Sequence, residues 1–212
     1  MKTLSKLFGS EDKVKVMRLF LFNPDVYFFA DQVATRSKVS EKAALAEIVS
    51  LENAGMVRSR SSVQVTEVKK RGKLIEVKKK TSCWQLDPSF EYLPQMQNLL
   101  INSRPLRKEE ILKRLSNVGK LKMVIIAGVF IQDKESRVDI LIVGDQLKRG
   151  VIDKIMKVME SEIGKELNYT SFETADFQYR LSMCDKLVRD ILDYPHQKLL
   201  DKTGFKIEPR RA

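Results

Sequence analysis

Residues Phe28 to Val57 read FFADQVATRSKVSEKAALAEIVSLENAGMV, and this stretch decides the fold of the first half of the chain. It predicts a short helix over residues 29–35, a polar turn at residues 36–38 and a second helix that begins at Ser40 and ends at Gly55. The Ser40 hydroxyl can accept a backbone N–H that would otherwise be unpaired, and Gly55 can adopt a left-handed conformation. The apolar residues of the second helix recur at the spacing of one buried face: Ala44, Ile48 and Leu51. Together these features predict a helix-turn-helix.

Two extended, basic runs follow, over residues 57–68 and 74–86, and a charged tip with one glycine lies between them. Nine Lys or Arg and two acids lie between Arg58 and Lys80. Alternating apolar residues predict an inner face for this hairpin: Val63, Val65, Leu74, Ile75 and Val77. A cationic ribbon of this kind can lie along a phosphate backbone. The alternative is an edge hairpin that lysines keep soluble.

The pattern LxxLExAGxV closes the second helix, with Ile48 in its first position and Leu51, Glu52, Ala54, Gly55 and Val57 in the others. It resembles that of bacterial and archaeal winged-helix transcription regulators. The resemblance implies a winged helix-turn-helix domain over residues 1–90, in which a short strand at residues 26–28 joins the wing. It also implies DNA contacts, which we expect from Ser37, Lys38, Ser40, Lys42, Leu45, Arg58, Arg60, Lys69, Lys70, Arg71 and Lys73.

The charge of the chain favours an anionic partner. The formal net charge is +11, and residues 1–90 hold 17 Lys and Arg against 10 Asp and Glu. Nucleic acid is the first candidate, before membrane surfaces and acidic proteins.

The only cysteines, Cys83 and Cys184, are far apart in sequence, so we expect neither a zinc site nor a disulfide. This cysteine usage fits a reducing compartment, and we therefore expect a cytoplasmic location. No apolar run approaches the ~20 residues that span a bilayer, and we expect no membrane association.

The second half of the chain changes character after a predicted helical linker over residues 91–119. Continuous β-branched runs predict buried strands at residues 122–127 and 138–143, and a third strand is predicted at residues 167–172. An amphipathic helix is predicted over residues 147–163, helical or mixed structure over 173–193 and a flexible tail over 203–212. The predicted class is α+β, with an α/β domain around a small mixed sheet over residues 120–202.

The order of strand, glycine, strand with Asp, helix and strand resembles the minimal nucleotidyltransferase fold. Active members of that family carry Gly-Ser after the first strand and Asp-x-Asp entering the second. Here Val129 follows Gly128, and Arg137 stands two residues before Asp139. A guanidinium at that place would repel the Mg²⁺ that the family binds. The resemblance therefore implies a degenerate domain without catalytic residues, metal or cofactor, in which Arg137 forms an ion pair with Asp139 or binds an anion.

Other carboxylates do not restore that motif. Asn168 and Thr170 stand near the place of the third acid, and both are weak metal ligands. Asp133 and Glu135 could compensate, but they lie in a predicted connection between strands.

The whole chain also resembles a family of small-genome bacterial proteins that are described as winged-helix or transcriptional-regulator-like. The resemblance rests on the stretches FLFNPD, IAGVFIQD, SRVDILIVGD and DYPHQKLLDK. It implies a regulator that binds double-stranded DNA, with a C-terminal domain that serves dimerisation or ligand sensing. A Mg-dependent nucleotidyltransferase and a protein-interaction scaffold, with Leu45 and Val49 as the partner patch, remain the alternatives.

Overall fold

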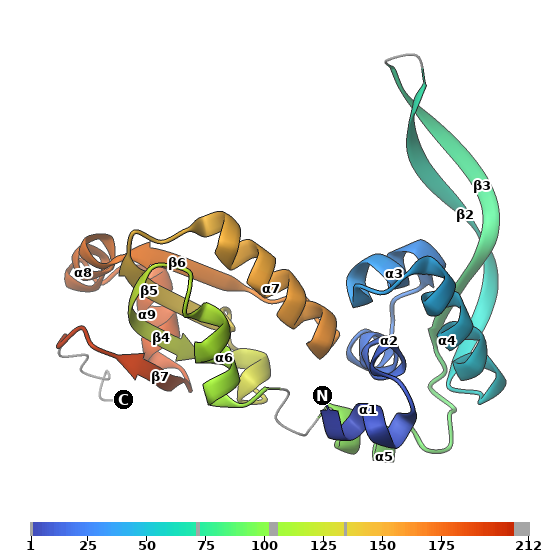
Figure 1. Ribbon diagram of the computed structural model, residues 1–212, viewed down its shortest axis with the longest axis horizontal. Coiled ribbons are helices and arrows are strands. Elements are labelled where there is room, and N and C mark those ends of the chain that lie inside the picture. Colours follow the sequence, from blue (N-terminus) through green and yellow to red (C-terminus); the bar gives the residue numbers. More distant parts are fainter. Residues whose placement is uncertain (1, 71–72, 102–105, 134, 206–212) are drawn as a thin grey trace. The chain divides into compact units, whose positions relative to one another are not determined.

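The computed structural model describes residues 2–70, 73–101, 106–133 and 135–205, and its helices and strands place the chain in the α+β class. The chain forms two units (Figure 1). The first comprises Met1–Ser103 with Glu160–Lys165, and the second comprises Arg104–Met159 with Glu166–Ala212. The predicted linker over residues 91–119 is thus divided between the two units.

The first unit combines helices with a three-stranded antiparallel sheet of order β1-β3-β2. Its strands and helices are α1 (Lys2–Phe8), α2 (Glu11–Phe22), β1 (Phe28–Phe29), α3 (Ala30–Ser37), α4 (Glu41–Asn53), β2 (Val57–Lys70), β3 (Lys73–Leu86) and α5 (Leu93–Leu100). Phe28 of β1 stands opposite Trp84 of β3, so the predicted third strand of the hairpin sheet is present. The β2–β3 hairpin projects well beyond α3 and α4 (Figure 1).

The predicted helix-turn-helix elements are confirmed at α3 and α4. Lys38 ends α3 in a left-handed conformation, with φ 52° and ψ 48°. The Ser40 hydroxyl accepts the Ala43 N–H at 3.2 Å, which caps α4 as expected. Gly55 has φ +76°, where a side chain would be strained, and the chain turns there into β2.

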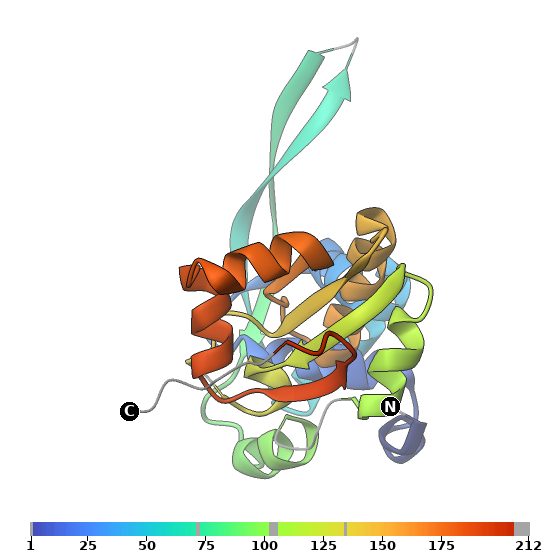
Figure 2. The same ribbon diagram turned by 90° about the vertical axis from the view of Figure 1, so that its left-hand side faces the viewer.

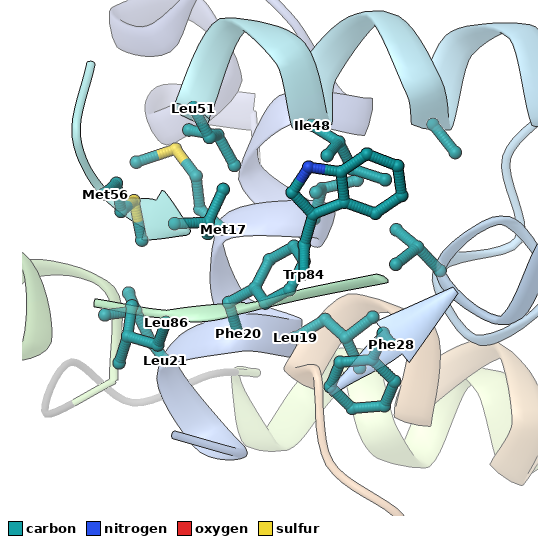
Figure 3. Close-up of a cluster of buried hydrophobic side chains, with 14 of the residues drawn as sticks. Met17, Leu19, Phe20, Leu21, Phe28, Ile48, Leu51, Met56, Trp84 and Leu86 are labelled. Carbon is teal, nitrogen blue, oxygen red and sulfur yellow. The ribbon is translucent and has the colours of Figure 1, made fainter. Parts of the chain in front are cut away.

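The core of the first unit lies between α2, α4 and the base of β3 (Figure 3). Phe20 and Ile48 are fully buried, and burial of such side chains stabilises the fold by about 1.5–3 kcal/mol each. Trp84 covers this core from β3 and is 7% exposed. Its indole N–H donates to the Glu52 carboxylate at 2.9 Å. Glu52, the acid of the LxxLExAGxV pattern, therefore ties α4 to the hairpin.

The Ser40 cap leads to a first prediction about stability. Replacing Ser40 by Ala is expected to lower the free energy of unfolding by about 1 kcal/mol, because the Ala43 N–H loses its acceptor. Urea unfolding of the full chain measures this change. Ser40→Asn, which keeps a capping oxygen, should remain close to the wild type, and equal destabilisation by both variants would show that the cap is not the cause.

The second unit is built on a four-stranded mixed sheet of order β6-β5-β4-β7, in which only β5 and β6 are parallel to each other. The predicted strands and central helix are present. The last strand, β7, was not expected from the sequence. In chain order the elements are α6 (Lys108–Leu115), β4 (Lys120–Ile126), the 3-10 turn η1 (Gly128–Phe130), β5 (Ile140–Asp145), α7 (Arg149–Ile163), β6 (Tyr169–Glu173), α8 (Thr174–Ser182), α9 (Lys186–Asp193) and β7 (Gln197–Asp201).

Helices cover both faces of this sheet (Figure 2). On one face, Met123 and Ile125 of β4 pack in a cluster with Phe177 of α8 and Val188 of α9. Phe205 also packs against this cluster, with its ring centroid 6.2 Å from that of Phe177. The prediction of a flexible tail from residue 203 is therefore wrong for residues 203–205, and residues 206–212 lie outside the described part of the chain.

The two cysteines differ in environment: Cys83 is buried in β3, whereas Cys184 is exposed between α8 and α9. Within the described ranges, no helix is both long enough and apolar enough to cross a membrane.

Candidate nucleic-acid interface and the Asp139 turn

The outward face of α4 carries the predicted groove residues, and it is largely apolar. Leu45 is 46% exposed and Val49 is 43% exposed, while Lys42 and Ala46 are also exposed. The opposite face is buried, as the spacing of Ala44, Ile48 and Leu51 predicted. Glu41, in the first turn of α4, is exposed as well. A duplex on the outward face would thus meet one cation, one carboxylate and a row of methyl groups. Side chains with paired donors and acceptors, which read base edges most selectively, do not occur among these residues.

The turn before α4 brings together only part of the predicted set. Lys38 and Ser40 are exposed, and the Ser40 hydroxyl can still donate its hydrogen while it caps the helix. Ser37 is 1% exposed, so its predicted contact with a phosphate is wrong. Ser37 is the last residue of α3, and its hydroxyl has no hydrogen-bond partner among the described residues.

Arg58 and Arg60 are exposed at the base of the β2–β3 hairpin. The Arg60 guanidinium lies over the Tyr27 ring, 3.5 Å from its centroid, which holds the cation in place. Arg58 lies near Asp87. The pKa of the Asp87 carboxyl is below its ordinary value because the Ser89 hydroxyl and backbone N–H donate to it, and Arg58 adds to the effect. Arg60 is thus the better positioned of the two arginines to meet an anion.

Farther out, the hairpin carries three consecutive lysines that the predicted contact set omitted. Lys78, Lys79 and Lys80 are exposed, and they stand opposite Val65, Gln64 and Val63. The three lysines are visible in the sequence as a KKK run, but the predicted contacts were placed at the glycine-containing tip. Arg71 of that tip lies outside the described residues, and only the backbone of Lys69, Lys70 and Lys73 is described.

The predicted inner face of the hairpin is wrong at Val63, Val65 and Val77, whereas the side chains of Leu74 and Ile75 lie outside the described part of the chain. Val63 is 56% exposed, Val65 is 51% exposed and Val77 is 43% exposed. These exposures show that no apolar layer of the described residues covers the three valines. A hydrogen bond from the Gln64 amide to the Asp31 carboxylate at 2.8 Å attaches the ribbon to the first turn of α3.

In the second unit, Asp139 is a structural residue of the turn that follows β4. It is 4% exposed, and its two carboxylate oxygens accept the N–H of Val129 at 2.8 Å and of Asn168 at 2.9 Å. Gly128 has φ +51°, and a Cβ at this position would collide with the Asp139 carboxylate. The Gly128-Val129 turn is therefore built around the carboxylate that the family resemblance would assign to a metal.

Arg137 does not pair with Asp139, so the predicted internal pair is wrong. Its guanidinium forms an ion pair with Asp190 of α9, with an N–O distance of 2.8 Å. Asp190 lies 53 positions farther along the chain, so only the packing of α9 brings it to Arg137. The side chain of Arg137 remains 65% exposed.

The other acids near this turn do not assemble a metal centre. Asp133 accepts the Glu135 N–H at 3.0 Å through one oxygen, and its other oxygen is buried without a described partner. Asn168 contributes backbone N–H and C=O groups to the Asp139 turn, and Thr170 lies within β6. Across the described part of the chain, no cluster of three or more His, Cys, Asp or Glu side chains could hold a metal ion.

Comparison with protein-family models, with curated proteins and with solved structures finds no match for this chain. Its function therefore has to be inferred from its own residues.

Proposed function

We propose that this protein is a transcriptional regulator that binds double-stranded DNA through α4 and the β2–β3 hairpin of its first unit. The observation that carries the proposal is the projecting ribbon with exposed Lys78, Lys79 and Lys80 in the same unit as an exposed helix of a helix-turn-helix. A two-stranded ribbon can follow a groove while its lysines neutralise phosphates. In this arrangement α4 enters the major groove and the hairpin acts as the wing.

Sequence preference is expected to be modest. Lys42 can contact a phosphate or a base, and Leu45 can contact a thymine methyl group. The remaining exposed residues on this face of α4 offer little selectivity. Most of the affinity then comes from phosphate contacts, which weaken steeply as salt rises.

The second unit is proposed to act without catalysis, in dimerisation or ligand sensing. Both oxygens of Asp139 are engaged by backbone N–H groups, and Arg137 occupies the place of the first carboxylate. These features disfavour a two-metal centre, which needs several free carboxylate oxygens. Nucleotidyltransferase activity is therefore not proposed.

Selection of bound sequences from random duplexes at two salt concentrations tests the DNA proposal. A binding constant that falls with salt, together with an enriched motif, is the expected result. A palindromic motif would also indicate a symmetric dimer. Failure to bind any duplex at low salt, or binding that is independent of salt, would overturn the proposal.

Exposed Leu45 and Val49 also suit a patch that binds an apolar protein partner. A charged substitution on this face of α4 distinguishes a helix that enters a DNA groove from one that binds protein. Leu45→Glu is expected to weaken duplex binding by about tenfold or more, since the new carboxylate would face phosphates. Fluorescence anisotropy with a labelled duplex measures the change. Leu7→Glu in α1, at a residue that is 66% exposed, is the matched control. Unchanged DNA affinity of Leu45→Glu would assign this face to a protein partner instead.

A further inference from the structure

The second unit contains a cationic cleft at the opposite end of β4 from the Asp139 turn. It has a volume of about 480 Å³, within the usual range for small-molecule sites. The cleft lies where the end of α6 meets the start of β4 and the end of β7. Its lining residues are Leu112, Ser116, Gly119, Lys120, Leu121, Lys122, Leu200 and Lys202.

The lining separates into a charged and an apolar part. Three of the lining residues are lysines, Lys120, Lys122 and Lys202, and no acidic residue belongs to the lining. Among the described residues, none of the three forms an ion pair. Asp145 stands opposite Lys120 in the strand register but does not line the cleft. Three side chains supply apolar surface, and none of them is aromatic: Leu112, Leu121 and Leu200.

The backbone at the start of β4 is shaped so that these side chains converge. Leu121 pairs with Gly144 and Met123 pairs with Val143, so Lys122 has no opposite residue on β5. This bulge breaks the alternation of the strand, and consecutive Leu121 and Lys122 both line the cleft. The presence of neighbouring lysines in one lining is thus tied to strand geometry, in addition to their abundance in the chain.

Gly119 lies immediately before β4 and Gly144 lies near the end of β5, where two backbone segments pack closely. Gly119 has φ +143°, and a Cβ there would lie 2.7 Å from the backbone oxygen of Gln146. Gly144 is equally confined, because its Cβ would lie 2.5 Å from the backbone oxygen of Lys120. Residues 119–120 and 144–146 therefore pack so closely that neither glycine position has room for a side chain.

We propose that this cleft binds a small phosphorylated molecule with a hydrocarbon part. Lysine ammonium groups bind phosphate as point charges, and three of them match a phosphate monoester that carries close to two negative charges. The three leucines match a hydrocarbon chain, whereas the lining offers no aromatic surface on which a nucleobase could stack. The site gives the second unit a ligand class and does not require that the first unit bind DNA.

Calorimetric titration of the full chain with hexyl phosphate tests the site, with inorganic phosphate and hexanol as half-ligands. Hexyl phosphate is expected to bind at least about tenfold more tightly than either, because it alone uses both the lysines and the leucines. Amide shifts at Gly119, Leu121 and Lys122 would locate the ligand. Equal affinity for hexyl phosphate and inorganic phosphate would overturn the proposal.

Two variants of equal charge provide the control. Lys120→Gln/Lys122→Gln/Lys202→Gln is expected to lose hexyl phosphate binding, whereas Lys154→Gln/Lys157→Gln/Lys186→Gln, whose lysines are exposed on α7 and α9, should retain it. Equal losses in both variants would show that only net charge matters, and the proposal would fail.

Flotation with vesicles that contain phosphatidic acid distinguishes the source of the phosphate. If the wild-type protein binds these vesicles and the cleft variant does not, the ligand is a lipid headgroup. If the wild-type protein binds hexyl phosphate but not the vesicles, the ligand is a free metabolite. If the wild-type protein does not bind hexyl phosphate and the cleft variant binds duplex DNA more weakly, these lysines contact DNA. That outcome would overturn the proposal.

Discussion

Asp139→Ala is expected to lower the free energy of unfolding of the second unit by about 2–4 kcal/mol. The substitution leaves the part-buried N–H groups of Val129 and Asn168 without their acceptor. An unpaired donor costs about 1–3 kcal/mol when it is fully buried, so these two together cost less than that maximum allows. Loss of the buried carboxylate also removes the packing partner of Gly128. Because small domains are stable by only about 5–15 kcal/mol, the change is large enough to unfold part of the population.

Urea unfolding followed by circular dichroism measures this change, and hydrogen exchange at Val129 and Asn168 locates it. Asp190→Ala is the matched control, because it removes a carboxylate whose ion pair with Arg137 is partly exposed. Such pairs contribute about 0–1 kcal/mol. If Asp139→Ala were as stable as Asp190→Ala, the Asp139 carboxylate would not hold the turn and a ligand role would regain support.

Replacing Lys78, Lys79 and Lys80 by Gln is expected to weaken duplex binding by more than about tenfold at ~0.1 M salt. If each lysine contacts one phosphate, the slope of log K against log salt should decrease by about three. The effect should be similar for all duplex sequences, because phosphate contacts carry no base information. Fluorescence anisotropy over a series of salt concentrations measures both quantities.

The triple variant Lys154→Gln/Lys157→Gln/Lys186→Gln removes the same charge from the second unit and should leave the slope nearly unchanged. An equal decrease in both variants would mean that the hairpin has no special contact with DNA. The fold is expected to tolerate the hairpin substitutions because all three side chains are exposed.

The sequence predicted the elements whose signals are local. Ser40 and Gly55 marked the ends of α4 within two residues, and the β-branched runs located the central strands of the second unit. In these places the cap, the turn conformation and the apolar spacing all favour one structure. The base of the hairpin, where Trp84 and Leu86 are buried, falls within the predicted extended run over residues 74–86.

The errors concern contacts that depend on distant parts of the chain. Ser37 stands in a polar stretch, but the turn of α3 buries it. The alternation of Val63 and Val65 suggests a covered face, yet whether any layer reaches the outer hairpin is a tertiary property. The family motif suggested Asp139 as the partner of Arg137, whereas the actual partner, Asp190, lies on α9. β7 is only five residues long, and it gains its stability from pairing with β4.

The natural sequence also supplies its own pair of spectroscopic reporters. Trp84 is the only tryptophan and lies in the first unit, while Cys184 is the exposed one of two cysteines and lies in the second. A thiol-reactive acceptor dye should therefore label Cys184 in preference to Cys83, without any substitution. Energy transfer from the indole to that dye would then report whether addition of duplex or hexyl phosphate changes the distance between the two units.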